Sequence, residues 1–219
     1  MKQIMTSNWV AVLGLFALIA GCAPGPSMYS QLSPVAQGTV VQYLLNPHGN
    51  VDGLLLADGT QVQFPPHMED ELVAVVQPND PVTVQGYRHV GASAVTAYVV
   101  TNTHSGRAAV KHEPSWFDRP LLPPHMRRWF MREMAAEGRV RALLYAPRGE
   151  VHGVVLEDGT QVRIPPHARY HFSGLLQVGQ SISAVGYGTE NRFGRVLEAA
   201  VMGAPGGAIG APAGAGRVP

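Results

Sequence analysis

Three histidines share a setting that suits a metal ligand, because each directly follows a pair of prolines. The three motifs are Pro65-Pro66-His67, Pro123-Pro124-His125 and Pro165-Pro166-His167. Imidazole is the commonest metal ligand in proteins, and His167 and His171 are spaced so that both lie on one face of a helix. The candidate ligands of a divalent transition metal are therefore His67, His125, His167 and His171.

The alternative interpretation of Pro-Pro-His is structural. A proline fits the first position of a helix, where its missing N–H would have no partner, and the histidine then lies in the first turn. No His-Glu-x-x-His motif, no cysteine and no acidic residue at ligand spacing accompanies His167 and His171. We therefore expect these motifs to begin helices and expect no cofactor, with metal binding as the alternative.

Acidic residues at repeated positions have a simpler explanation than catalysis. Asp58 and Asp158 both belong to Asp-Gly pairs, which predict type I′ hairpin turns. Asp52 and His152 occupy equivalent positions, and their mismatch argues against one shared catalytic role. The sequence also lacks Gly-x-Ser-x-Gly, a phosphate-binding glycine loop and a Cys/His nucleophile pair. We predict no catalytic residue and no enzyme, with a hydrolase of unfamiliar site as the third alternative.

The N-terminus carries a targeting signal. Lys2 precedes an apolar run from Trp9 to Ala20, which is shorter than the ~20 residues that span a bilayer, so residues 1–21 are interpreted as a signal peptide. The following block, Ile19-Ala20-Gly21-Cys22, resembles the lipobox of bacterial lipoproteins. The resemblance implies lipid attachment (palmitate) at Cys22 and, with Ala23 next in the chain, an outer-membrane address facing the periplasm. An ordinary signal peptide with Cys22 as a bystander is the alternative.

The body of the chain is duplicated. Residues 38–87 align without a gap on residues 138–187, with 19 identities in 50 positions that include the block Asp-Gly-Thr-Gln-Val. Each copy is longer than a solenoid unit of ~20–50 residues, so the duplication predicts two complete small domains.

The element order inside each copy predicts the fold class. In the first copy, strands are expected at 38–46, 51–57, 60–64, 82–87 and 94–100, with a helix after Pro66. The second copy repeats this order with strands near 138–146, 151–157, 160–164, 180–187 and 194–202, and a helix over 166–176. This order resembles the OB-fold. We predict a mainly β protein of two five-stranded, OB-like antiparallel barrels, each with a helix between strands 3 and 4; an SH3-type barrel is the alternative.

Three further segments, which are a tether, a connector and a tail, flank and join the two repeats. Residues 22–37 form a tether, repeat 1 covers 38–102, a connector covers 103–137, repeat 2 covers 138–202, and residues 203–219 form a disordered Gly/Ala/Pro tail. The connector is expected to contain an amphipathic helix that ends near Glu137 and packs on the barrels or lies on an anionic membrane. Its candidate partner or membrane face comprises Trp129, Phe130, Arg127, Arg128 and Arg132.

Charge narrows the choice of partner. The chain has a formal net charge of +1. Repeat 1 has one arginine against six acidic residues (1 − 6 = −5), while repeat 2 has seven arginines against five acidic residues. Low overall charge argues against a nucleic acid partner, and the opposite signs suggest that the barrels attract each other or a partner. The resulting hypothesis is a lipid-anchored envelope protein that binds or scaffolds an envelope protein or glycan; a periplasmic metal-binding protein is the alternative.

Overall fold

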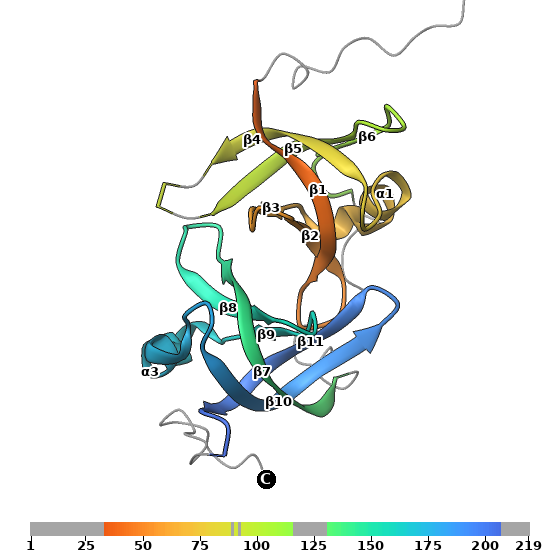
Figure 1. The fold of residues 1–219 in the computed structure, drawn as a ribbon. Helices are drawn as coiled ribbons and strands as arrows, with labels where there is room; N and C mark the ends of the chain where they lie inside the picture. Colours follow the sequence, from red (N-terminus) through yellow and green to blue (C-terminus); the bar gives the residue numbers. More distant parts are fainter. Residues whose placement is uncertain (1–32, 89, 92, 116–130, 207–219) are drawn as a thin grey trace, which may run out of the picture.

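Two five-stranded β-barrels lie one against the other and make up a mainly β protein (Figure 1). The computed structural model describes residues 33–88, 90–91, 93–115 and 131–206. Within those ranges, none of the helices has the length and apolar character needed to cross a bilayer. The predicted fold class, two small OB-like barrels with a short helical segment between strands 3 and 4, is confirmed.

Barrel 1 is built from β1 (Pro34–Leu45), β2 (Val51–Leu56), β3 (Gln61–Gln63), β4 (Pro81–Arg88) and β5 (Ala94–Asn102). The strands run in the order β3-β2-β1-β4-β5, and a parallel pairing of β3 with β5 closes the barrel. A short strand, β6 (Ala108–Val110), adds to the other half of β5. Between β3 and β4 lie a 3-10 turn (Pro66–Met68) and helix α1 (Glu69–Val75).

Barrel 2 repeats this arrangement with β7 (Arg132–Tyr145), β8 (Val151–Leu156), β9 (Gln161–Arg163), β10 (Ser181–Asn191) and β11 (Gly194–Gly203). Its parallel closure joins β9 to β11. The segment between β9 and β10 contains a 3-10 turn (Pro166–Ala168), helix α3 (Arg169–Phe172) and a second 3-10 turn (Ser173–Leu175). The 3-10 turns of both barrels begin at the second proline of a Pro-Pro-His motif, as the helix-entry interpretation predicts.

Each barrel has its own apolar core, which its helical segment covers at one end. Met68 and Leu72 are buried in the core of barrel 1, and Ala168 and Phe172 are buried in the core of barrel 2. Alternation of buried and exposed residues along the strands supplies the remaining core, because successive side chains of a strand point to opposite faces. The core of barrel 1 also receives Val196 of β11, and Phe193 packs against it, so barrel 2 contributes to that core.

Four segments differ from the sequence-based expectation. Strand β1 begins at Pro34, so the last four residues of the predicted tether belong to barrel 1. Residues 132–137, expected to end the connector helix, instead open β7, because they pair with β10 from Ser183 to Gly188. The connector also contributes β6 to barrel 1. At the other end, Gly203, the first residue of the predicted tail, is the last residue of β11.

The Asp-Gly turns have another geometry than the predicted type I′. Gly59 has φ +83° and Gly159 has φ +86°, but Asp58 and Asp158 are not among the described residues with positive φ. Each aspartate instead accepts hydrogen bonds from the backbone N–H and the hydroxyl of the threonine two residues later, Thr60 or Thr160, at 2.8–2.9 Å. This is the pattern of a type I turn followed by a left-handed glycine.

Candidate functional site at the junction of the barrels

The barrels meet through a small apolar cluster made of equivalent residues. Leu44 and Leu144 are equivalent positions of the two copies, and so are Leu55 and Val155; all four are at most 3% exposed. Because the same positions contribute from both sides, the junction has approximate two-fold symmetry. This cluster is separate from the two barrel cores and exists only where the barrels touch.

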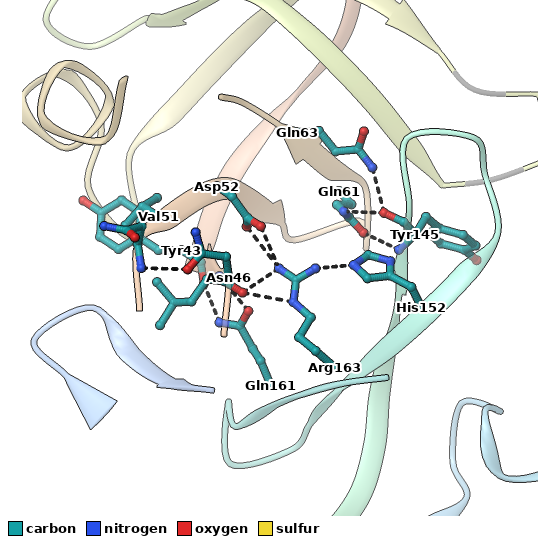
Figure 2. Close-up of polar contacts among 12 residues, drawn as sticks. Tyr43, Asn46, Val51, Asp52, Gln61, Gln63, Tyr145, His152, Gln161 and Arg163 are labelled. Atoms are coloured by element: carbon teal, nitrogen blue, oxygen red, sulfur yellow. Dashed lines mark hydrogen bonds and ion pairs between the residues drawn. The ribbon is translucent and has the colours of Figure 1, made fainter. Parts of the chain in front are cut away.

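Two buried glutamines cross this junction in opposite directions (Figure 2). Gln161 of β9 accepts a hydrogen bond from the Leu45 backbone N–H (2.8 Å) and donates to the Tyr43 carbonyl (2.9 Å). Gln61 of β3 accepts from the Tyr145 N–H (2.8 Å) and donates to the Tyr145 carbonyl (3.0 Å). Each glutamine therefore bonds with the first long strand of the other barrel as a further strand would. Both glutamines are at most 3% exposed, so these bonds satisfy polar groups on both sides of a largely buried junction.

Arg163 joins the two barrels through charge. Its guanidinium donates to the Leu45 carbonyl at 3.0 and 2.6 Å and to both oxygens of Asp52 at 3.0 and 3.2 Å. A third contact reaches Nε2 of His152. The arginine side chain is 8% exposed and that of Asp52 is 27% exposed. Asp52 and His152, which occupy equivalent positions of the two copies, thus flank one guanidinium (Figure 2).

The protonation of both flanking groups is shifted. Burial, together with the nearby positive charges of Arg163 and Arg169, lowers the pKa of His152 to about 3. The imidazole is therefore neutral near pH 7 and accepts the Arg163 N–H at Nε2. Burial raises the pKa of the Asp52 carboxyl above its ordinary value, while the Arg163 guanidinium opposes that shift.

On one flank of the junction, the β10–β11 hairpin of barrel 2 reaches onto barrel 1. Thr189 Oγ1 donates to the Pro47 carbonyl (3.3 Å) and Asn191 Nδ2 donates to the Gly49 carbonyl (2.8 Å). The Phe193 ring stands edge-on to Tyr43, with 5.4 Å between ring centroids. Gly49 has φ +88°, and a Cβ there would lie 2.9 Å from Asn191 and from Thr189. The glycine is therefore required both by the turn and by the approach of the hairpin.

On the opposite flank, the junction leaves a cavity of about 310 Å³. Apolar and aromatic side chains make up most of its wall, and the Asp52–Arg163 pair lies at its edge with the neutral His152. The lining residues of barrel 1 are Asp52, Gln61, Gln63, Phe64, Pro65, Pro66, Tyr87 and Thr96, and those of barrel 2 are Tyr145, Pro147, His152 and Arg163. A cavity of this size with a few convergent polar groups has the form of a ligand site.

The predicted metal ligands are not brought together. His67 lies in barrel 1, where its Nε2 is 3.1 Å from the His112 carbonyl, while His167 and His171 lie in barrel 2. Across the parts of the chain that the structure describes, no three His, Cys, Asp or Glu side chains lie close enough to hold a metal. His125 lies outside the described residues.

The predicted anchor and partner face are mostly beyond the described residues, which do not include Cys22, Arg127, Arg128, Trp129 or Phe130. Arg132 is the exception, and it belongs to β7 rather than to a helix. Its side chain donates to Glu190 of β10 at 2.8 Å, across neighbouring strands. Arg132 therefore ties two strands of barrel 2 together.

The residues that build the junction were not among the sequence-based candidates. Gln61 and Gln161 carried one available signal: each is a polar residue, kept in both copies, directly before the buried Val62 or Val162. Arg163 carried none, because Gln63 stands at the equivalent position. The Asp52/His152 mismatch was noted in the sequence, and its meaning lies in the contact of both residues with Arg163.

Comparison with known proteins assigns no family to this chain: no family model and no curated protein matches it. Among solved structures, it aligns with a deletion variant of the single-stranded DNA binding protein from Thermus aquaticus at 15% identity. The alignment covers 77% of this chain and 91% of that chain, with a TM-score of 0.24. This match contradicts the sequence-based exclusion of nucleic acid as a partner, and that exclusion no longer stands. A likeness of this size assigns no ligand, so the chain is described by its two OB-like barrels and their shared junction.

Proposed function

We propose that this chain is a lipid-anchored protein of the bacterial cell envelope, in which the two barrels act as one rigid binding or scaffolding unit. The observation that carries the proposal is the exchange of Gln61 and Gln161, with Arg163, across a buried junction. Breaking these contacts would leave backbone groups of both barrels unpaired, which is costly in a buried setting. Two barrels fixed in this way present one continuous surface to a partner.

The lipobox-like block at Cys22 supports the anchoring part of the proposal. Lipid on Cys22 would hold the protein on the membrane, since several acyl chains bind far more firmly than one. Ala23 after the cysteine favours the outer membrane, with the barrels in the periplasm. The partner we propose is another envelope component, protein or glycan, and the proposal assigns no catalytic step to any residue.

Metabolic labelling with a palmitate analogue, followed by membrane fractionation, tests the anchor. We expect the wild-type chain to be labelled and to sediment with outer membranes, and the Cys22→Ser variant to be unlabelled and released from them. Lipid label retained in Cys22→Ser, or wild-type protein without label, would contradict the anchor.

The binding role has its own test. The lipid-free body, residues 23–219, contains every described strand, and we expect it to retain an envelope protein or glycan saturably from a detergent extract of envelopes. A body that retains nothing saturably, while folded by circular dichroism, would contradict the binding role.

A further inference from the structure

The two flanks of the junction are equivalent by symmetry but differ in what covers them. The β10–β11 hairpin covers one flank. On the other flank, the β4–β5 hairpin occupies the equivalent position, and the cavity of about 310 Å³ opens between it and barrel 2. The covered flank therefore shows what kind of group the open flank is built to accept.

The difference arises from hairpin length. Gln61 pairs with Ala94 and Gln161 pairs with Val196, so Ala94 and Val196 are equivalent positions. Five residues (89–93) separate Arg88 from Ala94, whereas seven (189–195) separate Gly188 from Val196. The pairing of β10 with β11 accordingly continues to Asn191 and Gly194, beyond the point where β4 and β5 stop pairing. The described residues at the tip of the shorter hairpin, Val90, Gly91 and Ser93, are exposed.

The loop that receives the long hairpin is reproduced on the open flank, where Leu143 stands at the position of Tyr43. In barrel 1 the Gly49 N–H donates to the Asn46 carbonyl at 2.8 Å, and in barrel 2 the Gly149 N–H donates to the Ala146 carbonyl at the same distance. The φ angles of Gly49 and Gly149 are +88° and +89°. The β1–β2 and β7–β8 loops thus have the same turn, so Pro147 and Gly149 present their carbonyls as Pro47 and Gly49 do.

The contacts on the covered flank define the chemistry. Thr189 and Asn191 alternate along β10 and so lie on one face, and Phe193 follows in the turn; together they supply a hydroxyl, an amide and an aromatic ring to barrel 1. Glu190, between them, pairs with Arg132 of its own barrel. The three groups that Thr189, Asn191 and Phe193 offer to barrel 1 are uncharged, while Arg192 lies over the Phe193 ring, 4.5 Å from its centroid, beside Tyr43.

The cavity matches such a face. Tyr87 and Tyr145 offer aromatic surface, and Gln63 and Thr96 add polar groups. The charged residues of its wall, Asp52 and Arg163, are paired with one another, so the wall has no net charge that favours a charged ligand.

We propose that this cavity is a docking site for an extended segment of a partner protein, whose contacts with the cavity wall come from uncharged hydroxyl, amide and aromatic side chains. The segment would occupy the open flank as Thr189–Phe193 occupies the covered one. This inference rests on the proposed binding function and names the partner class for it, a protein rather than a glycan.

The probe is a head-to-tail cyclised peptide with the sequence of residues 187–197, titrated into the isotope-labelled body (residues 23–219). We expect saturable chemical-shift changes at the backbone amides of Tyr87, Thr96 and Tyr145 and of the residues next to Pro147. Tyr87→Ala should weaken binding about tenfold, because a buried aromatic contact is lost. Tyr187→Ala is the matched control, since it removes the equivalent, exposed tyrosine of barrel 2 and should leave the affinity unchanged.

A loop graft gives a second variant that does not depend on a single side chain. Replacing residues 89–93 with the seven residues 189–195 should give the protein its own hairpin over the cavity. This graft should abolish peptide binding while the body stays folded. Shifts elsewhere on the body, equal binding by wild type and graft, or saturable binding of a neutral disaccharide but not of the peptide would overturn the inference. An envelope component that is captured equally by wild type, Tyr87→Ala and graft would refute this site while leaving the proposed binding function standing.

Discussion

The two barrels use equivalent residues at the centre of their junction and different residues at its edges. At the centre, Leu44 faces the same cluster as Leu144, and Gln61 makes the same kind of backbone bonds as Gln161. At the edge, Arg163 stands opposite Gln63, and a longer hairpin stands opposite a shorter one. The shared residues hold the barrels together in a symmetric way. The differing residues close one flank and leave the other open, with the Asp52–Arg163 pair at the edge of its cavity, so the duplicated domain has a single candidate site.

The largest effect should come from the symmetric centre. Leu44→Ala and Leu144→Ala should each lower the free energy of unfolding by about 3 kcal/mol, because both side chains are fully buried and leave a cavity. The two costs should agree within about 1 kcal/mol if the cluster is symmetric. Urea titrations followed by circular dichroism measure both. A cost near zero for either leucine would break the symmetry of the junction.

The next largest loss of stability should show that the two copies contribute differently to the junction. Arg163→Ala should cost about 3 kcal/mol, since it leaves Asp52 without its partner in a poorly solvated place. Gln63→Ala, the equivalent change in barrel 1, should cost about 1 kcal/mol or less, because the Tyr145 carbonyl keeps its bond from Gln61. The same urea titrations compare the two variants. Equal costs would show that the charged contact adds nothing to the junction.

Acid should weaken the junction through His152. Its pKa is about 3 in the folded chain and near 6.5 when unfolded, so the unfolded chain binds the proton first as pH falls. The free energy of unfolding should therefore fall below pH 6.5, with a slope of up to about 1.4 kcal/mol per pH unit. His152→Gln retains an acceptor for Arg163 and cannot take up this proton, so its stability should depend less on pH between 6.5 and 5. Parallel slopes for wild type and His152→Gln over that range would contradict the account.

The smallest loss of stability should distinguish the β10–β11 hairpin from the β4–β5 hairpin. Phe193→Ala should cost about 1.5 kcal/mol, because the ring packs on Tyr43 while staying partly exposed. Val90→Ala, at the opposite hairpin, should change stability by less than about 0.5 kcal/mol, since this side chain is fully exposed. Thermal unfolding of both variants tests the difference. A cost for Val90→Ala that matched Phe193→Ala would mean that both hairpins dock alike.

The barrels themselves were predictable because the strand alternation, the Asp-Gly turns and the Pro-Pro-His helix starts occur twice at constant spacing. The segment 132–137 was wrongly assigned to a helix. Met134 suited a helical face together with Trp129 and Phe130, but it also alternates with Ala136 as buried residues of a strand. Pairing with β10 decides between the helical and the strand periodicity. That pairing is a long-range contact, so a short stretch of sequence does not reveal it.

The contacts at the junction could not be predicted from sequence patterns, because they too are long-range contacts. A glutamine in a strand gives no sign that its amide will serve as a partner for the backbone of another domain. Asp52 lies 111 residues from Arg163 in the chain, and only the fold brings it to the guanidinium that His152 also contacts from the neighbouring strand. The mismatch at positions 52 and 152 was visible, yet its explanation requires knowing that one guanidinium lies between them.

The most direct test of the junction is amide hydrogen exchange at Leu45 and Tyr145, whose N–H groups are held by a glutamine of the opposite barrel. We predict a crossed pattern. Gln161→Ala should reduce protection of the Leu45 amide by about tenfold more than that of Tyr145, and Gln61→Ala should do the reverse. Protection that stays unchanged in both variants, or that falls equally at both amides in each, would contradict the claim that the two barrels exchange backbone hydrogen bonds through these glutamines.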